Sequence, residues 1–194
     1  MPQVITIITD GSADNRTGSG GWACIIRTSS SLSELIGWED GTTSNRMELM
    51  AAIQGLLAIN IPSDIDLISD SAYLVNTMRN KWYLRWFDDA GNGKGTDRPN
   101  LDLWLTLASI SKFHNIKWIK IKGHSGDYWN TRADRLADYA RTKKQNSVEV
   151  IDEFQDKRCE DVADSGMQCK LHYKHTGSHY WTNGLANGVK IYGD

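Results

Sequence analysis

The sequence predicts an α/β fold with a five-stranded mixed sheet, in which three antiparallel strands are followed by parallel additions, and with helices on both faces. Short β-rich runs alternate with segments of helical periodicity in the order βββαβ…αβα, which is typical of such a sheet. The chain has 194 residues, enough for one well-packed domain and a small appendage. Its 40% hydrophobic and 24% charged residues describe an ordinary globular protein.

Three β-rich runs open the chain. They cover residues 3–9, 20–28 and 33–39. The Ser-rich stretch 28–31 separates the second run from the third, so the three runs predict an antiparallel meander. The first run ends on Asp10 and Gly11.

A helix is predicted next, over residues 44–59. Apolar residues recur on one of its faces at helical spacing: Leu49, Ala52, Ile53, Leu56 and Leu57. Asn45 is followed three residues later by Glu48, a spacing that resembles a capping box. This interpretation places Glu48 in the first helical turn.

The remaining elements complete the sheet and its cover. Pro62 and Ser63 end the first helix, and a strand over 65–69 ends at Asp70. The elements that follow are a short helix at 71–79, an aromatic helix at 81–87, a loop at 88–100, a helix at 101–114, a strand at 116–121 and a last helix at 127–143. Asp10 and Asp70 are thus predicted at strand ends, where sites on open α/β sheets lie.

The composition changes at about Gln145. We expect a domain over residues 1–145, a linker over 146–152 and a small Cys/His module over 153–194. No apolar run approaches the roughly 20 residues that cross a bilayer, and the N-terminus lacks the features of a signal peptide. Three cysteines do not make a disulfide framework, so a cytoplasmic setting is expected.

The charge is unevenly distributed along the chain. Residues 1–145 carry 17 basic and 16 acidic side chains, and residues 146–194 carry 5 and 8. Four acids of the first part belong to the metal site described next, so its remaining scaffold carries about +5. The first part is suited to bind a polyanion, and the second is not.

Four acidic residues stand in separate, recognisable settings. They are Asp10 in ITDGS, Glu48 in NRMEL, Asp70 in LISDSAY and Asp134 in NTRADRLAD, and His124 in KGHSG joins them. Each acid alone is more simply a helix cap or a turn residue. Together, carboxylates without a compensating lysine suit Mg²⁺. A pair of such ions about 3.5–4 Å apart is a general solution to phosphodiester hydrolysis.

At these motifs the chain resembles the ribonuclease H type 1 family, over about residues 1–143. The resemblance implies a ribonuclease H-like fold and an endonuclease that cuts the RNA strand of RNA/DNA hybrids, leaving 5′-phosphate and 3′-hydroxyl ends. It implies two Mg²⁺ ions, with Mn²⁺ as a substitute, held by Asp10, Glu48, Asp70 and Asp134. His124 would assist proton transfer or product departure. A non-catalytic hybrid-binding module and a DNA-cutting nuclease of the same fold are the alternatives, and a monomer is expected.

The resemblance also implies substrate contacts. The 2′-hydroxyls of the RNA would be contacted by Asn45 and by the backbone at Gly11, Ser12 and Glu48, since the 2′-hydroxyl distinguishes RNA from DNA. Thr43 matches a DNA-phosphate contact. The loop 13–19 departs from the family pattern and places Arg16 there as a DNA-side contact. Residues 79–98 match the basic handle of the family, in which Trp82, Arg85 and Trp86 would bind the hybrid. Alternatively, Trp82 and Trp86 pack against the helix 101–114.

The C-terminal module contains a candidate zinc site. Cys159, Cys169, His175 and His179 form the pattern C-x9-C-x5-H-x3-H, and His172 is an alternative ligand. Two thiolates and two imidazoles suit tetrahedral Zn²⁺, and a metal would help about 40 residues with few aliphatic side chains to fold. The alternative is a flexible tail, and the module is also a candidate for binding a protein or nucleic-acid partner. Cys24, on a strand, is expected to be a core thiol.

Overall fold

The computed structural model of the protein describes residues 4–91, 97–123 and 127–152. The strands are β1 (Ile5–Asp14), β2 (Ser19–Arg27), β3 (Ser31–Asp40), β4 (Asp64–Ser69), β5 (Asn115–Lys120) and β6 (Ser147–Asp152). The helices are α1 (Ser44–Leu57), α2 (Ala72–Arg79), α3 (Trp82–Gly91), α4 (Leu101–Ser111) and α5 (Tyr128–Lys143). Within these ranges no helix has the length and apolar character that a membrane crossing requires.

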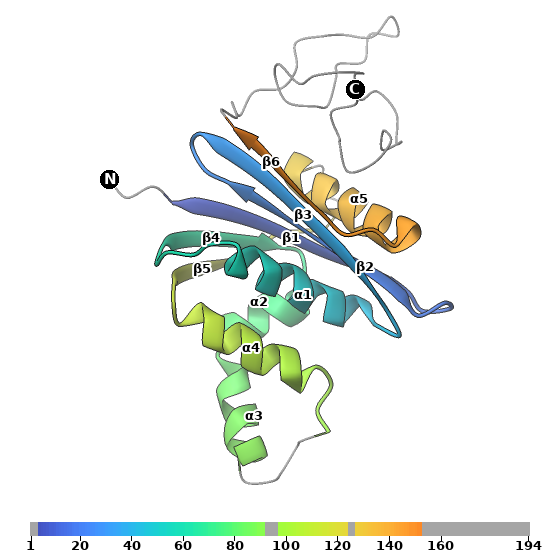
Figure 1. The fold of residues 1–194 in the computed structure, drawn as a ribbon. Helices are drawn as coiled ribbons and strands as arrows, with labels where there is room; N and C mark the ends of the chain where they lie inside the picture. Colours follow the sequence, from blue (N-terminus) through green and yellow to red (C-terminus); the bar gives the residue numbers. More distant parts are fainter. Residues whose placement is uncertain (1–3, 92–96, 124–126, 153–194) are drawn as a thin grey trace, which may run out of the picture.

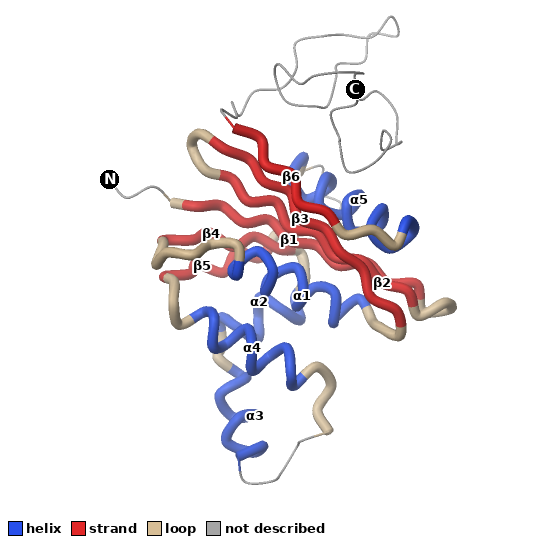
Figure 2. The backbone as a smooth tube through the Cα atoms, viewed as in Figure 1, coloured by secondary structure: helices blue, strands red, loops and turns tan. Residues whose placement is uncertain are grey.

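The strands form one mixed sheet in the order β5-β4-β1-β2-β3-β6 (Figures 1 and 2). β1, β2 and β3 are an antiparallel meander, and β4 and β5 add in parallel to the other side of β1. Helices α1, α2 and α4 cover one face, whereas α5 covers the other, and α3 projects beyond α4 (Figure 1). The predicted α/β fold with five strands in mixed order is therefore confirmed.

A sixth strand replaces the linker predicted over residues 146–152. β6 pairs antiparallel with β3, from Ile36↔Ser147 to Ser31↔Asp152. The stretch SVEVID contains three β-branched residues, which favour a strand. The free backbone groups of the β3 edge supply its partner. The prediction of a linker was wrong because this long-range pairing outweighs the local change in composition.

Two element boundaries also differ from the prediction. β1 continues four residues beyond Asp10, because β2 pairs with it as far as Asp14↔Ser19. Helix α1 is capped by Thr43 rather than Asn45: the Thr43 hydroxyl accepts a hydrogen bond from the backbone N–H of Arg46 at 3.3 Å. Glu48 is consequently the fifth residue of α1 and lies in its second turn.

The aromatic helix is also longer than predicted. α3 extends to Gly91, so the first residues of the predicted loop 88–100 are helical. α3 follows directly on α2, with Lys81 between them at a φ of 53°. The handle predicted for residues 79–98 is therefore built largely on this projecting helix (Figure 1).

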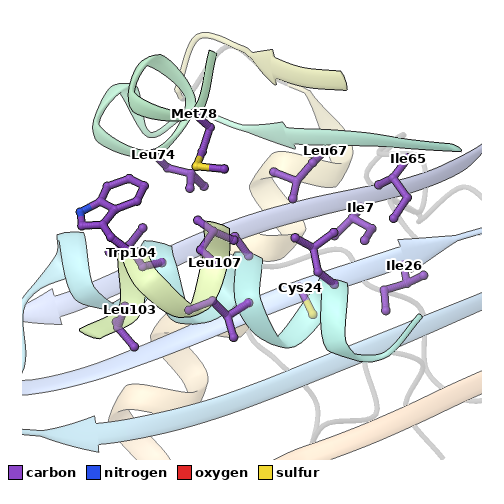
Figure 3. Close-up of a cluster of buried hydrophobic side chains, with 14 residues drawn as sticks. Ile7, Cys24, Ile26, Ile65, Leu67, Leu74, Met78, Leu103, Trp104 and Leu107 are labelled. Atoms are coloured by element: carbon purple, nitrogen blue, oxygen red, sulfur yellow. The ribbon is translucent and has the colours of Figure 1, made fainter. Parts of the chain in front are cut away.

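The core has two parts, one on each face of the sheet. Under α5 lie the buried residues Ile8, Ala23, Ile25, Leu32, Ile36, Ala133, Leu136, Ala137 and Ala140. The larger part, between the sheet and α1, α2 and α4, includes Ile7, Cys24, Leu67, Leu74 and Trp104 (Figure 3). Cys24 is fully buried, as expected of a core thiol, and burial raises its pKa. Both helical layers are thereby held against the strands that carry the candidate site.

Candidate metal-dependent active site

Asp10 and Asp70 lie side by side because of strand register. The parallel pairing of β1 with β4 ends at Thr9↔Ser69, where β4 ends and β1 continues. Each aspartate is the residue that follows this last pair. Asp70 is thus just beyond a strand end, as predicted, while Asp10 lies within β1, at the point where β1 loses its neighbour on that side.

Glu48 reaches the two aspartates because α1 packs closely against Gly11. A Cβ atom at position 11 would lie 2.3 Å from the backbone nitrogen of Glu48 and 2.6 Å from the carbonyl carbon of Met47. Any other residue there would displace the helix. The glycine of the ITDGS motif is therefore what allows α1 to bring Glu48 to the strand.

The three carboxylates converge on one point. One oxygen from each of Asp10, Glu48 and Asp70 lies within 4.8 Å of the others. Asp10 is 6% exposed and Glu48 is 8% exposed. Among the residues that the structure describes, no ion pair involves any of the three, and Glu48 Oε2 is buried without a hydrogen-bond partner. Buried carboxylates with unused lone pairs are the donor set that a hard divalent cation requires.

Burial and repulsion between carboxylates disfavour ionisation of Asp10 and Glu48 in the metal-free fold. Burial, followed by the charges of Asp70 and Asp134, raises the pKa of Asp10 to about 8. Burial and the charges of Asp10 and Asp70 raise the pKa of Glu48 well above its ordinary value. Hydrogen bonds from the Gly11 N–H and the Ser69 hydroxyl oppose the rise at Glu48. A bound cation would remove the repulsion and restore the ionised forms.

Asp134 belongs to this region without joining the tight cluster. It is half-buried on α5, and its charge contributes to the raised pKa of Asp10. The group within 4.8 Å contains the other three acids only. His124 lies outside the described residues, as do Cys159, Cys169, His172, His175 and His179. The structure thus brings together three of the predicted ligands and places the fourth close enough to act on Asp10.

Two polar residues next to the acids were not proposed as site residues from the sequence, although Asn130 is the first residue of the motif NTRADRLAD. Ser69 is fully buried, and its hydroxyl hydrogen-bonds Glu48. Asn130 is 4% exposed, and its Nδ2 donates to Asp70 Oδ2 at 3.1 Å. The available signals were their positions, one residue before Asp70 and one helical turn before Asp134.

A groove at the N-terminus of α1 gathers several predicted substrate contacts. It has a volume of about 420 Å³ and is lined by Thr43, Asn45, Tyr73, Thr77, Trp82, Trp86, Arg98, Pro99 and Asn100. The Arg98 guanidinium lies 4.4 Å from the centroid of the Trp86 ring. Trp86 also packs edge-on against the buried Trp104, at 5.6 Å between ring centroids. Trp86 therefore packs against α4, as one of the two interpretations predicted, and it also lines the groove, whereas Trp82 is half-exposed.

The other predicted substrate contacts differ in their exposure and in the elements that carry them. Asn45 and Arg85 are exposed, on α1 and α3 respectively. Arg16 has an 85% exposed side chain and pairs with Asp14 at 3.6 Å. Gly11 and Ser12 lie on β1, next to Asp10. The Thr43–Asn45 corner of the groove lies at the N-terminus of α1, the helix that also carries Glu48.

A carboxylate cluster able to hold divalent cations on a mixed sheet is the kind of site that metal-dependent phosphodiesterases use. The family model "RNase H" matches residues 2–142. The chain is 42% identical over 138 residues to the ribonuclease H of Caldanaerobacter subterraneus subsp. tengcongensis, covering 70% of this chain and 89% of that protein. It is 40% identical over 151 residues to the ribonuclease H of Thermoanaerobacter sp. strain X514, covering 75% and 96%.

Solved structures show the same fold. LC9-RNase H1, described as a type 1 RNase H with the type 2 active-site motif, superposes with a TM-score of 0.69 at 24% identity, covering 78% of each chain. LC11-RNase H1 in complex with an RNA/DNA hybrid superposes with a TM-score of 0.52 at 21% identity, covering 72% of this chain and 97% of that one. The chain therefore belongs to the ribonuclease H family and is an endonuclease that hydrolyses the RNA strand of RNA/DNA hybrids.

Proposed function

We propose that the enzyme works with two Mg²⁺ ions, or Mn²⁺ in their place, held by Asp10, Glu48, Asp70 and Asp134. When bound, such ions lower the pKa of the attacking water and neutralise charge on the leaving 3′-oxygen, which yields 5′-phosphate and 3′-hydroxyl ends. The observation that carries the proposal is the convergence of three carboxylates within 4.8 Å, two of them buried, without an ion pair among the described residues.

The residues of the chain have distinct roles in this mechanism. Asp10 feels the charges of both Asp70 and Asp134, and it would hold the metal together with them. Glu48 offers the buried Oε2 that has no partner among the described atoms. His124, four residues before the start of α5 in the sequence, is proposed to move a proton or to help the product leave.

The substrate would lie across α1 and the groove beside it. We assign the RNA 2′-hydroxyls to Asn45 and to the backbone at Gly11 and Ser12, because these groups adjoin Asp10 and Glu48. Thr43, Trp82 and Trp86 line the groove and are assigned to the DNA strand, with phosphate and stacking contacts. Arg85 and Arg16 are exposed and would add charge attraction at the edges.

A cleavage assay tests the mechanism. The full chain is incubated with labelled RNA/DNA hybrid, double-stranded DNA or single-stranded RNA, each with Mg²⁺ or with chelator. We expect cleavage of the RNA in the hybrid only, with Mg²⁺ only, and loss of cleavage in Asp10→Asn. Cleavage of DNA would favour the alternative nuclease, and hybrid binding without any cleavage would favour the non-catalytic module.

The C-terminal residues carry a separate proposal. Cys159, Cys169, His175 and His179 are proposed to bind a structural Zn²⁺. Less than about half a zinc per chain after metal-replete expression would refute it. A cytoplasmic location and a monomeric state are proposed with it, and Cys24, a free thiol within the described core, agrees with a reducing compartment.

A further inference from the structure

Asn130 connects helix α5 to a predicted metal ligand on another element. It lies in the first turn of α5 and is 4% exposed. Its Nδ2 donates to Asp70 Oδ2 at 3.1 Å. Since a carboxylate oxygen can only accept, this contact also fixes which end of the Asn130 amide faces Asp70.

The side chain of Asn130 is free of the task of capping its helix. Asp127 caps α5 by accepting a hydrogen bond at 2.8 Å from the backbone N–H of Asn130, not from the side chain. Replacing the Asn130 side chain would leave this cap intact. The amide group is therefore available for a role at the carboxylates.

Asp70 Oδ2 is confined from a second direction. A Cβ atom on Gly123 would lie 2.7 Å from this oxygen, so the backbone before α5 packs directly against it. Asp70 Oδ2 is thus held by the donor of Asn130 on one side and by the chain at Gly123 on the other. Its other oxygen, Oδ1, accepts no hydrogen bond from the described residues.

The carbonyl end of the Asn130 amide is unused within the described part of the chain. Asn130 Oδ1 is buried and has no hydrogen-bond partner among the described residues. A buried acceptor without a partner is unfavourable, so such atoms usually accept from water or a ligand. Water molecules bound to a metal are strong donors and would fill this requirement.

We propose that Asn130 is a positioning residue of the metal site, which holds Asp70 through Oδ2 so that Oδ1 faces the cation, and which accepts a hydrogen bond from metal-bound water at its own Oδ1. This inference rests on the proposed metal-dependent function. The side chain must be a neutral amide, because it donates to a carboxylate without adding a further negative charge to the cluster. Residues that orient metal ligands in this way typically contribute about 10- to 100-fold to metal affinity or activity.

The test measures metal binding apart from catalysis. Binding of Mn²⁺ to the chelator-treated full chain is followed by calorimetry for the wild type, Asn130→Ala and Thr131→Ala. Thr131 is a matched control, because its hydroxyl donates to Asp127 O in the same helical turn and faces no acid of the cluster. We expect the Kd for Mn²⁺ to rise about 10- to 100-fold in Asn130→Ala and to stay within twofold in Thr131→Ala. A Kd within twofold of the wild type in Asn130→Ala would overturn the proposal.

Hybrid cleavage gives an independent measurement. Asn130→Ala should lower kcat at limiting Mg²⁺ and leave KM for the hybrid unchanged, and excess Mg²⁺ should recover part of the rate. A merely structural role predicts no recovery by metal. If the wild type binds Mn²⁺ at this site but cleaves no hybrid, the proposed function fails while the role of Asn130 is still decided by the calorimetry.

Asn130→Asp provides a second variant of nearly the same shape. It removes the donor and adds a carboxylate beside Asp70, so the chelated protein should melt several degrees below the wild type at pH 8, and below Asn130→Ala if that variant folds. A side chain that only fills space predicts no difference between asparagine and aspartate. An unchanged Tm for Asn130→Asp in chelator would therefore also overturn the proposal.

Discussion

Two buried glutamates of this enzyme have opposite electrostatic surroundings. Glu34, on β3, is 0% exposed and accepts a hydrogen bond from Nε of Arg132 on α5. Glu48, on α1, is 8% exposed, and the charged groups nearest to it are the carboxylates of Asp10 and Asp70. The two sites lie on opposite faces of the same sheet, since α5 covers one face and α1 the other (Figure 1).

This difference in surroundings distinguishes a glutamate that stabilises the fold, Glu34, from one that is available to bind metal, Glu48. Arg132 also donates to the Tyr128 hydroxyl at 3.0 Å and lies 5.9 Å from the Trp129 ring, so the cation that balances the charge of Glu34 comes from the chain itself. The cluster around Glu48 has no cation of its own among the described residues, and burial raises the pKa of Glu48. The charge of Glu34 is balanced as soon as the chain folds, whereas the carboxylates around Glu48 need a bound cation to balance theirs.

The largest effect is expected for Asp10→Asn. Removing this ligand should lower hybrid cleavage by at least about 10³-fold. It should also raise the stability of the chelated protein, because one repelling carboxylate is gone. Cleavage rate and Tm in chelator are measured together, with Asp66→Asn as the control, since Asp66 is a half-buried acid on β4 outside the cluster. A chelated Asp10→Asn protein that melts below the wild type would contradict the assignment.

Breaking the other pair should affect folding and not metal binding. Arg132→Met leaves Glu34 buried without its cation, which costs about 3–5 kcal/mol of unfolding free energy. The double variant Glu34→Gln/Arg132→Met should recover most of this loss, because no buried charge is left unpaired. Urea unfolding measures both effects. A single variant as stable as the double variant would show that this ion pair contributes nothing specific.

The pH dependence of stability should distinguish the two sites. The pKa of Asp10 is about 8 in the metal-free fold against 3.8 ordinarily. Between these values the folded protein holds a proton that the unfolded chain has released, so the stability present below pH 4 declines as pH rises toward 8. The slope is at most about 1.4 kcal/mol per pH unit for each proton. Urea unfolding at pH 5, 6.5 and 8 should show this decline in chelator and a flatter profile with Mg²⁺. An equal slope in Asp10→Asn would assign it to other groups.

The smallest effect is expected for an ion pair at the surface. Lys144 Nζ lies 2.7 Å from Asp40 Oδ2, and both side chains are about half exposed. Solvent screens such a pair, so Lys144→Ala should cost no more than about 1 kcal/mol. This variant is the reference for the comparison with Arg132→Met, because the ion pair that it removes is exposed to solvent. A loss as large as that of Arg132→Met would mean that burial is not what distinguishes Glu34.

The sequence predicts the residues of the carboxylate cluster better than it predicts the long-range contacts around them. Asp10, Glu48 and Asp70 could be assigned because each stands in a local motif beside a strand or helix boundary. β6 could not, because its strand character depends on pairing with β3 across more than 100 residues. The same holds for the contacts Asn130–Asp70 and Arg132–Glu34, which join residues 60 and 98 positions apart. Local patterns carry no direct record of such pairings.

Gly11 limits which substitutions this sequence can accept. A change of side chain at Glu48 would alter the carboxylate cluster and leave the backbone of α1 in place. At position 11 a single added carbon would lie 2.3 Å from the backbone of α1, so all nineteen alternatives meet the same obstruction. A saturation library at this codon should return glycine alone among active clones, although the glycine itself offers no ligand atom from a side chain. Gly11 offers no ligand atom from a side chain, yet it is the position of the site that we expect to tolerate substitution least.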